Sequence, residues 1–145
     1  MGPRSLILKF AVPGEPQGKG RARAFRTKSG VGHFTPERTR SYEAIIRSIA
    51  AEAMGTLTPV EGPVSMHLKA FFSAPKSLKK SQRELADAEQ LPVTKKPDVD
   101  NIAKSLCDGM NGIVYKDDSQ VFEVTASKHY SPRPRVEITI IHGEE

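Results

Sequence analysis

Four segments of the chain have the apolar content and the flanking turn residues that are typical of β-strands. The alternation is clearest between Val64 and Ala70, where every second side chain is apolar, as in a strand with one buried face. The last two segments are separated only by residues 131–134, and this short connection predicts a hairpin. The four predicted strands are residues 6–12, 63–73, 120–130 and 135–141.

A first main helix is predicted to begin at Thr35-Pro36-Glu37 and to run to about residue 54. Thr35 is suited to the N-cap, Pro36 to the first helical position and Glu37 to the first turn. Gly55 then ends the helical periodicity. The apolar face predicted for this helix consists of Tyr42, Ile45, Ile46 and Ile49.

A second main helix is predicted for residues 100–110. Its apolar residues recur at helical spacing, and Asn111-Gly112 supplies a left-handed stop directly after it. The apolar stripe predicted for this helix consists of Ile102, Ala103, Leu106 and Met110.

Two further segments complete the order of elements. The polar residues 77–89 predict a short exposed helix, and residues 91–96 are expected to be extended because Pro97 disfavours a helical residue before it. The resulting order is strand, helix, strand, helix, helix, strand, strand. This order predicts an α+β fold in a single domain over residues 1–145, with a mixed, mostly antiparallel sheet covered by helices.

The composition excludes several classes of protein. A chain of 145 residues suits one domain, and no run approaches the roughly 18 apolar residues of a transmembrane helix. The apolar run near the N-terminus is interrupted by Lys9 and is followed by no cleavage pattern, so we expect no secretory signal. Cys107 is the single cysteine, which excludes an intramolecular disulfide framework and a multi-cysteine zinc site. The expected compartment is the cytoplasm, without a membrane partner.

The net charge of +5 is unevenly distributed along the chain. Residues 1–60 contain ten basic and four acidic residues, whereas residues 61–145 contain 12 basic and 13 acidic residues. A basic half favours a polyanionic partner, nucleic acid first. The alternative is ordinary charge that keeps the protein in solution.

Residues 13–34 are rich in glycine and basic residues and poor in apolar ones, which predicts a long basic loop or arm. Guanidinium groups suit phosphate binding, and Phe25 and Phe34 could stack on exposed bases. The alternative is a disordered, solvated loop. The basic residues in and near this arm are Lys19, Arg21, Arg23, Arg26, Lys28, Arg38 and Arg40.

Five of the six aspartates lie within residues 98–118. Asp98 and Asp100 are two apart in a segment expected to be extended, so both side chains can point the same way. Residues 111–118 are long enough to bring Asp117 or Asp118 back beside them. Carboxylates placed together repel one another, and Mg²⁺, which prefers oxygen ligands, relieves that repulsion. Such a metal can activate water for attack on a phosphate.

Each part of this cluster also has an ordinary structural interpretation. Lys104 could offer a positive charge to the same phosphate, but it could also pair with Asp108 four residues later. Asp98 or Asp100 could serve only as an N-cap, and residues 117–118 alone are typical of a turn.

A longer pattern connects these residues. Residues 95–104 read KKPDVDNIAK, and Asp108, Asn111-Gly112 and the sequence DDSQV at 117–121 follow. This pattern resembles the RusA-type Holliday-junction resolvases of bacteria and their phages. PGEP at 13–16 and KGRARAF at 19–25 are similar to the phage-type branch of that family.

The resemblance implies a RusA-like fold and a homodimeric, Mg²⁺-dependent endonuclease, with Mn²⁺ as a substitute metal. Such an enzyme nicks two opposed strands of a four-way DNA junction in recombination and repair, leaving 5′-phosphate and 3′-hydroxyl ends. By the matching positions, Asp98, Asp100 and Asp118 are expected to bind the metal, and Lys104 is expected to be the catalytic lysine. The expected DNA-binding residues are Lys19, Arg21, Arg23, Arg26, Lys95 and Lys96.

Two other functions fit the same residues. One is a metal-dependent nuclease that acts on flaps or forks, and the other is a non-catalytic nucleic-acid-binding module in which the aspartates hold a structural ion. The dimer interface cannot be read from the pattern. Ile113, Val114 and Tyr115 are candidates for it, with plain core residues as the alternative.

Overall fold

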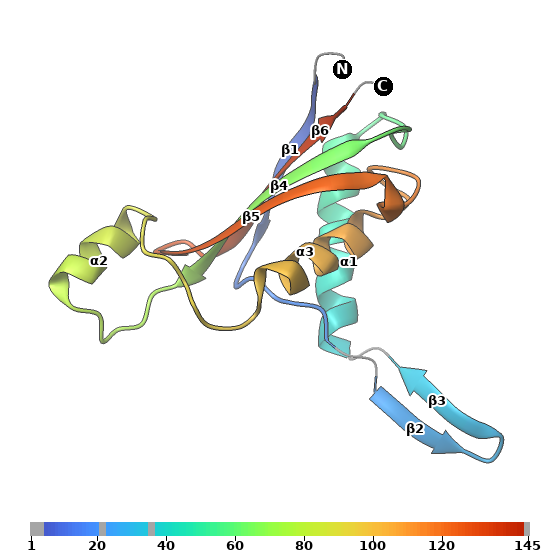
Figure 1. Ribbon diagram of the computed structural model, residues 1–145, viewed down its shortest axis with the longest axis horizontal. Helices are drawn as coiled ribbons and strands as arrows, with labels where there is room; N and C mark the ends of the chain where they lie inside the picture. The colour runs from blue at the N-terminus through green and yellow to red at the C-terminus, as the bar shows by residue number, and fades with distance from the viewer. Residues whose placement is uncertain (1–4, 21–22, 35–36, 144–145) are drawn as a thin grey trace.

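The computed structural model describes residues 5–20, 23–34 and 37–143. Within these residues, four strands form one mixed sheet in the order β1-β6-β4-β5 (Figure 1). β6 is antiparallel to both β1 and β4, whereas β5 is parallel to β4. The predicted α+β class with a mixed, mostly antiparallel sheet is therefore confirmed. The four strands are β1 (Ser5–Pro13), β4 (Val64–Ser73), β5 (Val121–Ser131) and β6 (Arg135–His142).

Two long helices, α1 and α3, pack against the same face of this sheet; in Figure 1, α1 passes behind the strands and α3 lies below β5. In the described part of the chain, no helix combines the length and apolar character needed to cross a membrane. α2 lies beyond one end of the sheet, and the short 3-10 helix η1 leads into β5. The helices are α1 (Glu37–Met54), α2 (Lys80–Asp87), α3 (Val99–Met110) and η1 (Asp118–Gln120).

The core forms where every second residue of the sheet meets the apolar stripes of α1 and α3. β4 buries Met66, Leu68 and Ala70 on this face, as the alternation in the sequence predicts. Ile45, predicted to lie on the buried face of α1, is 46% exposed instead. The buried helix residues at this interface are Tyr42, Ile46, Ala50 and Met54 of α1 and Ile102, Leu106 and Met110 of α3.

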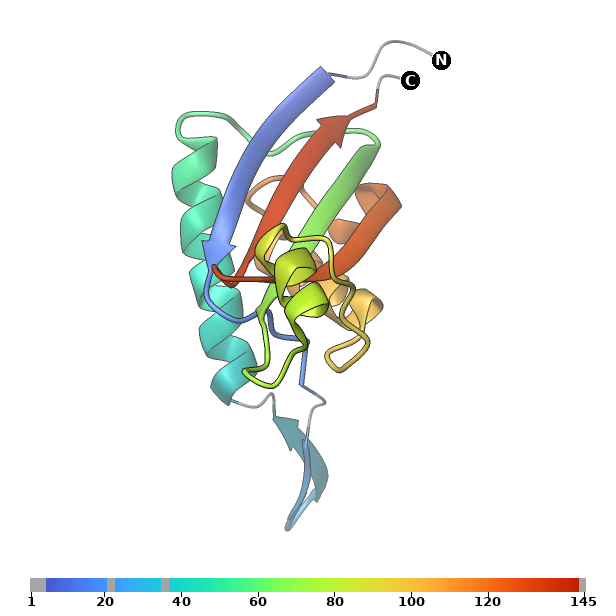
Figure 2. The ribbon, with the colours of Figure 1, turned by 90° about the vertical axis from the view of Figure 1, so that its left-hand side faces the viewer.

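The basic arm contains a hairpin of its own. β2 (Arg23–Thr27) and β3 (Gly30–Phe34) pair antiparallel, with Gly30 opposite Thr27. This arm hairpin projects away from the main sheet in both Figure 1 and Figure 2. The sequence predicts the position and charge of the arm, but its glycine-rich pattern does not indicate the strands β2 and β3.

The predicted hairpin of the last two strands is wrong, because β4 lies between β5 and β6. Residues 132–134 cross the end of β4, which stops at Ser73. Two strand spacings measure about 9.5 Å, and the four steps from Ser131 to Arg135 span up to about 13 Å. The connection is therefore long enough to skip one strand, and its length alone could not decide between the two arrangements.

The residues after α3 belong to the core. Val114 and Tyr115 are fully buried, and Ile113 packs against the same cluster. The Tyr115 hydroxyl donates a hydrogen bond to the backbone oxygen of Cys107 at 2.8 Å. Burial raises the pKa of both the Tyr115 hydroxyl and the Cys107 thiol. Val114 and Tyr115 therefore fit the core alternative and not an exposed dimer surface.

An ion pair connects the end of α2 to the sheet. The Arg135 guanidinium donates to Glu89 at 2.7 Å and to Glu137 at 3.0 Å, and it lies 4.0 Å from the ring centroid of Phe71. Hydrogen bonds from Arg135 first, and then from Ser131, lower the pKa of Glu89 to about 2. This pair fixes the start of the segment that leads from α2 to α3.

Close packing of α1 on α3 depends on Gly109. A Cβ at Gly109 would lie 2.6 Å from Cγ2 of Ile46, a side chain that is itself fully buried.

We predict that Gly109→Ala lowers the free energy of unfolding, because overpacking typically costs about 1–3 kcal/mol and exceeds the gain of about 1 kcal/mol in helix propensity. Chemical denaturation of this variant, with Ser48→Ala on the exposed side of α1 as the control, measures the difference. A Gly109→Ala protein more stable than wild type would contradict the packing.

Candidate active site

Two aspartates lie at the N-terminal end of α3. Asp98 is the N-cap residue in an extended conformation, and its backbone oxygen accepts the hydrogen bond of the Ile102 amide at 3.0 Å. Within the described residues, the Asp98 side chain accepts no capping hydrogen bond. Asp100 lies in the first turn, and both aspartates are exposed. Their carboxylates are thus available to a ligand. The Asp98 side chain does not have the N-capping role that the sequence allows.

Lys104, one turn along α3 from Asp100, lies between two other carboxylates. Its ammonium is 3.3 Å from Oδ1 of Asp108 and 3.9 Å from Oδ2 of Asp118. The chain after α3 therefore returns to the middle of the helix and brings Asp118 beside Lys104, whereas the sequence predicts a return beside Asp98 and Asp100. The predicted pairing of Lys104 with Asp108 is also confirmed.

The turn before β5 separates the roles of Asp117 and Asp118. The Asp117 carboxylate accepts a hydrogen bond from the Ser119 amide at 3.0 Å, and hydrogen bonds from the Ser119 side chain first, and then from this amide, lower the Asp117 pKa. The Gln120 amide oxygen accepts from the Lys116 amide, while its amide nitrogen donates to the backbone oxygens of residues 60 and 62. Asp117 and Gln120 therefore hold the turn, and Asp118 remains directed toward Lys104.

The structure does not gather the three predicted metal ligands into one cluster. Among the described residues, no group of three or more histidine, cysteine, aspartate or glutamate side chains is arranged to hold a metal ion. The donor chemistry nevertheless fits a hard divalent cation, since Asp98, Asp100 and Asp118 all offer carboxylate oxygens. Lys104, which is 57% exposed, places a positive charge beside Asp118.

Asp108 joins the site to the root of the arm. Lys19 pairs with the second oxygen of Asp108 and lies 3.4 Å from Glu43 of α1. The hydrogen bond to Asp108 raises the Lys19 pKa. Burial acts to raise the pKa of Asp108, but hydrogen bonds from Lys19 and Lys104 outweigh it, so that the pKa lies below its ordinary value. Asp108 is thus an ionised link between the arm and α3.

Residues 17–20, the arm root, lie against both long helices. A Cβ at Gly18 would be 2.4 Å from Nδ2 of Asn101 and 2.9 Å from Cβ of Pro97, so only glycine fits there without a shift. The Gly20 amide donates to the Thr39 hydroxyl of α1 at 2.8 Å. The sequence analysis missed this contact, although a glycine directly before the basic run was a visible signal.

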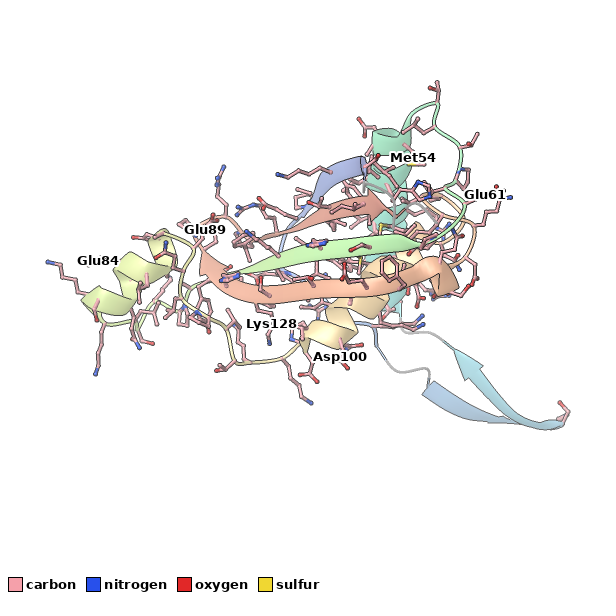
Figure 3. All side chains as sticks on the ribbon, turned by 45° about the horizontal axis from the view of Figure 1, so that its top comes forward. Met54, Glu61, Glu84, Glu89, Asp100 and Lys128 are labelled. Atoms are coloured by element: carbon pink, nitrogen blue, oxygen red, sulfur yellow. The ribbon has the colours of Figure 1, made fainter. Side chains whose placement is uncertain are left out.

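A lysine of β5 holds the loop before α3. The Lys128 ammonium donates to the backbone oxygens of Lys95 at 2.6 Å and Pro97 at 3.1 Å. The bond between Lys96 and Pro97 is cis. Figure 3 shows Lys128 on the side of the molecule where Asp100 lies. Sequence analysis did not assign a role to Lys128.

The predicted DNA-binding residues are placed as follows. Lys95 and Lys96 are exposed, and the Lys95 ammonium lies 5.8 Å and 5.9 Å from the ring centroids of Tyr130 and Phe72. Lys19 is paired with acidic side chains, as described above. Arg23 and Arg26 lie on β2, and Arg21 lies outside the described residues.

Comparison with known proteins identifies the family of this chain. The family model described as "Endodeoxyribonuclease RusA" matches residues 13–141, which include the arm, α3 and η1. An uncharacterized protein of Bacillus subtilis (strain 168), YqaN, is 38% identical over 135 residues, which cover 92% of this chain and 94% of that protein. The chain therefore belongs to the RusA family of endodeoxyribonucleases.

Proposed function

We propose that the protein resolves four-way DNA junctions by paired, metal-dependent nicks in recombination and repair, in the cytoplasm of a bacterium or a phage-infected cell. Membership of an endodeoxyribonuclease family supports the reaction. The observation that carries the proposal is the placement of Lys104, which lies one turn from Asp100 and 3.9 Å from Asp118. Asp100 and Lys104 of α3 and Asp118 of η1 thus lie near the root of the basic arm. Carboxylates that can bind a metal and a nearby lysine are suited to hydrolysis of a phosphodiester bond.

Asp98, Asp100 and Asp118 would hold the metal, Mg²⁺ or its substitute Mn²⁺. When bound, such an ion activates water and stabilises charge on the attacked phosphate. Asp100 lies in the first turn of α3, and the Asp98 side chain makes no capping hydrogen bond. The carboxylate oxygens of both residues are therefore available for coordination. Lys104 would release Asp118 to the metal and direct its ammonium to the phosphate or the leaving oxygen.

DNA binding is assigned to the arm and the loop before α3. The arm hairpin extends away from the sheet, as a segment that reaches around a duplex would. Lysine and arginine side chains neutralise phosphates and release counterions. The proposed contacts are Lys19, Arg21, Arg23, Arg26, Lys95 and Lys96.

A homodimer follows from the proposed reaction. Each chain carries one copy of the proposed site, and resolution of a four-way junction requires nicks in two opposed strands. Two-fold dimers are the commonest oligomers and place two identical sites in a symmetric relation.

We predict that the purified protein nicks a four-way junction in Mg²⁺, that chelation abolishes nicking, and that flap, fork and plain duplex substrates are cut more slowly. The nicking rate should fall by at least about a hundredfold in each of three variants, Asp98→Asn, Asp100→Asn and Asp118→Asn. Loss of one ligand weakens metal binding and with it the activation of water at the phosphate. Junction binding should persist or tighten, since negative charge near the phosphates is reduced.

Nicking and gel-shift assays on the same preparations separate these effects. Asp87→Asn, on the exposed α2, is the matched control for loss of an aspartate charge. Normal nicking by Asp100→Asn would refute the ligand assignment, whereas a preference for flaps over junctions would favour the alternative nuclease.

Lys104→Ala is predicted to reduce the single-turnover nicking rate much more than it reduces junction affinity. If Lys104 served only to pair with Asp108 on the helix, its loss would cost about 0.3–0.5 kcal/mol of stability and leave nicking intact. Single-turnover rates and thermal melting of the same variant distinguish the two roles. Lys116→Ala, which removes an exposed ion pair with Glu61, is the control.

The arm should contribute phosphate contacts. We predict that Arg21→Ala combined with Arg23→Ala weakens junction binding and reduces the slope of log affinity against log salt by about one unit for each lost contact. Binding titrations over a series of salt concentrations measure this slope, with Lys80→Ala on α2 as the control. An unchanged slope in the arm variant would place the DNA surface elsewhere.

A further inference from the structure

Lys128 occupies an unusual position for a lysine. In the register of β4 and β5, Lys128 is opposite Ala70, and its neighbours on the same face, Ala126 and Tyr130, pack against the hydrophobic core. Ala70 is fully buried. The alternation of the strand thus predicts an apolar residue here, and a lysine breaks the pattern. Breaks of this kind are expected at functional sites.

The Lys128 ammonium has specific partners. Lys128 is half-buried, and its Nζ donates to the backbone oxygens of Lys95 and Pro97. A hydrogen bond from a charged donor is stronger than one between neutral groups. The two carbonyl acceptors come from one short loop, so the ammonium holds both of them at a fixed separation from the sheet.

The loop that Lys128 holds delivers Asp98 to α3. Backbone hydrogen bonds attach the preceding segment to β5 at Leu91 and at Val93, which is 5% exposed. Beyond Val93, exposed residues follow as far as the half-buried Pro97. Within the described residues, the hydrogen bonds that connect this stretch to the sheet are those of Lys128. Asp98 is the next residue, and its backbone oxygen starts the hydrogen bonding of α3.

We propose that Lys128 is a positioning residue for Asp98: by binding the carbonyls of Lys95 and Pro97, it fixes the place at which the chain brings the Asp98 carboxylate to the head of α3. The inference rests on the proposed nuclease function for its consequence in catalysis. It assigns Lys128 no contact with DNA or with the reacting groups.

The test compares Lys128→Met with Lys128→Arg. Methionine keeps the apolar stem and loses the donors, whereas arginine keeps donors and charge. Lys69→Met is the matched control, because Lys69 lies on the adjacent strand, is opposite Ser127 and is exposed. Thermal melting verifies folding, and Lys128→Gln carries the test if the methionine variant is unfolded.

Three measurements are required. Lys128→Met should slow single-turnover nicking of a four-way junction in Mg²⁺ by at least about tenfold, since small displacements of a catalytic group have effects of that size or larger. Its junction affinity should stay within about twofold of wild type, because the proposal gives Lys128 no phosphate contact. Exchange of the Ile102 amide hydrogen, which is bonded to the Asp98 oxygen, should accelerate by about tenfold, while β5 amides stay protected. Lys128→Arg should restore both the rate and the protection.

The outcomes separate the inference from the function. Wild-type nicking and exchange in Lys128→Met would overturn the inference. A slower rate with unchanged Ile102 exchange, or a loss of junction affinity, would also overturn it, because Lys128 would then act directly on the DNA. If the wild-type protein cuts no DNA, the proposed function fails, and the exchange measurement still decides whether Lys128 holds the start of α3.

Discussion

The arrangement of the site depends on the carboxylate of Asp108. This side chain is only 16% exposed, and each of its oxygens is paired with a lysine from a different part of the chain. An ionised group in such surroundings requires partners, because an unpaired half-buried charge is strongly unfavourable. The same requirement therefore holds Lys19 against α3 and orients the Lys104 side chain along the helix toward Asp108. One carboxylate thus positions both the arm root and the proposed catalytic lysine.

The same electrostatic constraint explains the order of charges along α3. Asp100, Lys104 and Asp108 alternate in sign at intervals of one turn, and Asp118 returns to the central lysine. Without Lys104, the carboxylates on this flank would repel one another. A divalent cation would compete with the lysine for Asp118, so the lysine both stabilises the unliganded helix and becomes available when the proposed metal binds.

Elements with a strong local pattern could be predicted from the sequence. Residues close together in the chain set the apolar stripe of α3 and the alternation of β4, and the structure has both. The pairing of β5 with β4 could not be predicted, because the connection at 132–134 permits either neighbour and the choice depends on packing across the sheet. The contact of Gly18 with Asn101 joins residues 83 positions apart, and no local pattern encodes it.

Breaks in the local pattern were more informative about the site than the pattern itself. Gly109, in the last turn of α3, lowers helix propensity, yet it permits Ile46 to approach and so sets the spacing between α1 and α3. Those two helices hold the arm root through Thr39 on one side and through Asn101 and Asp108 on the other. Because the arm root contacts both helices, the close packing of α1 on α3 also sets the distance from the arm to Lys104. Binding of a phosphate backbone by the arm would therefore place the DNA in a defined register relative to the proposed site, without requiring the arm hairpin itself to contact any catalytic residue.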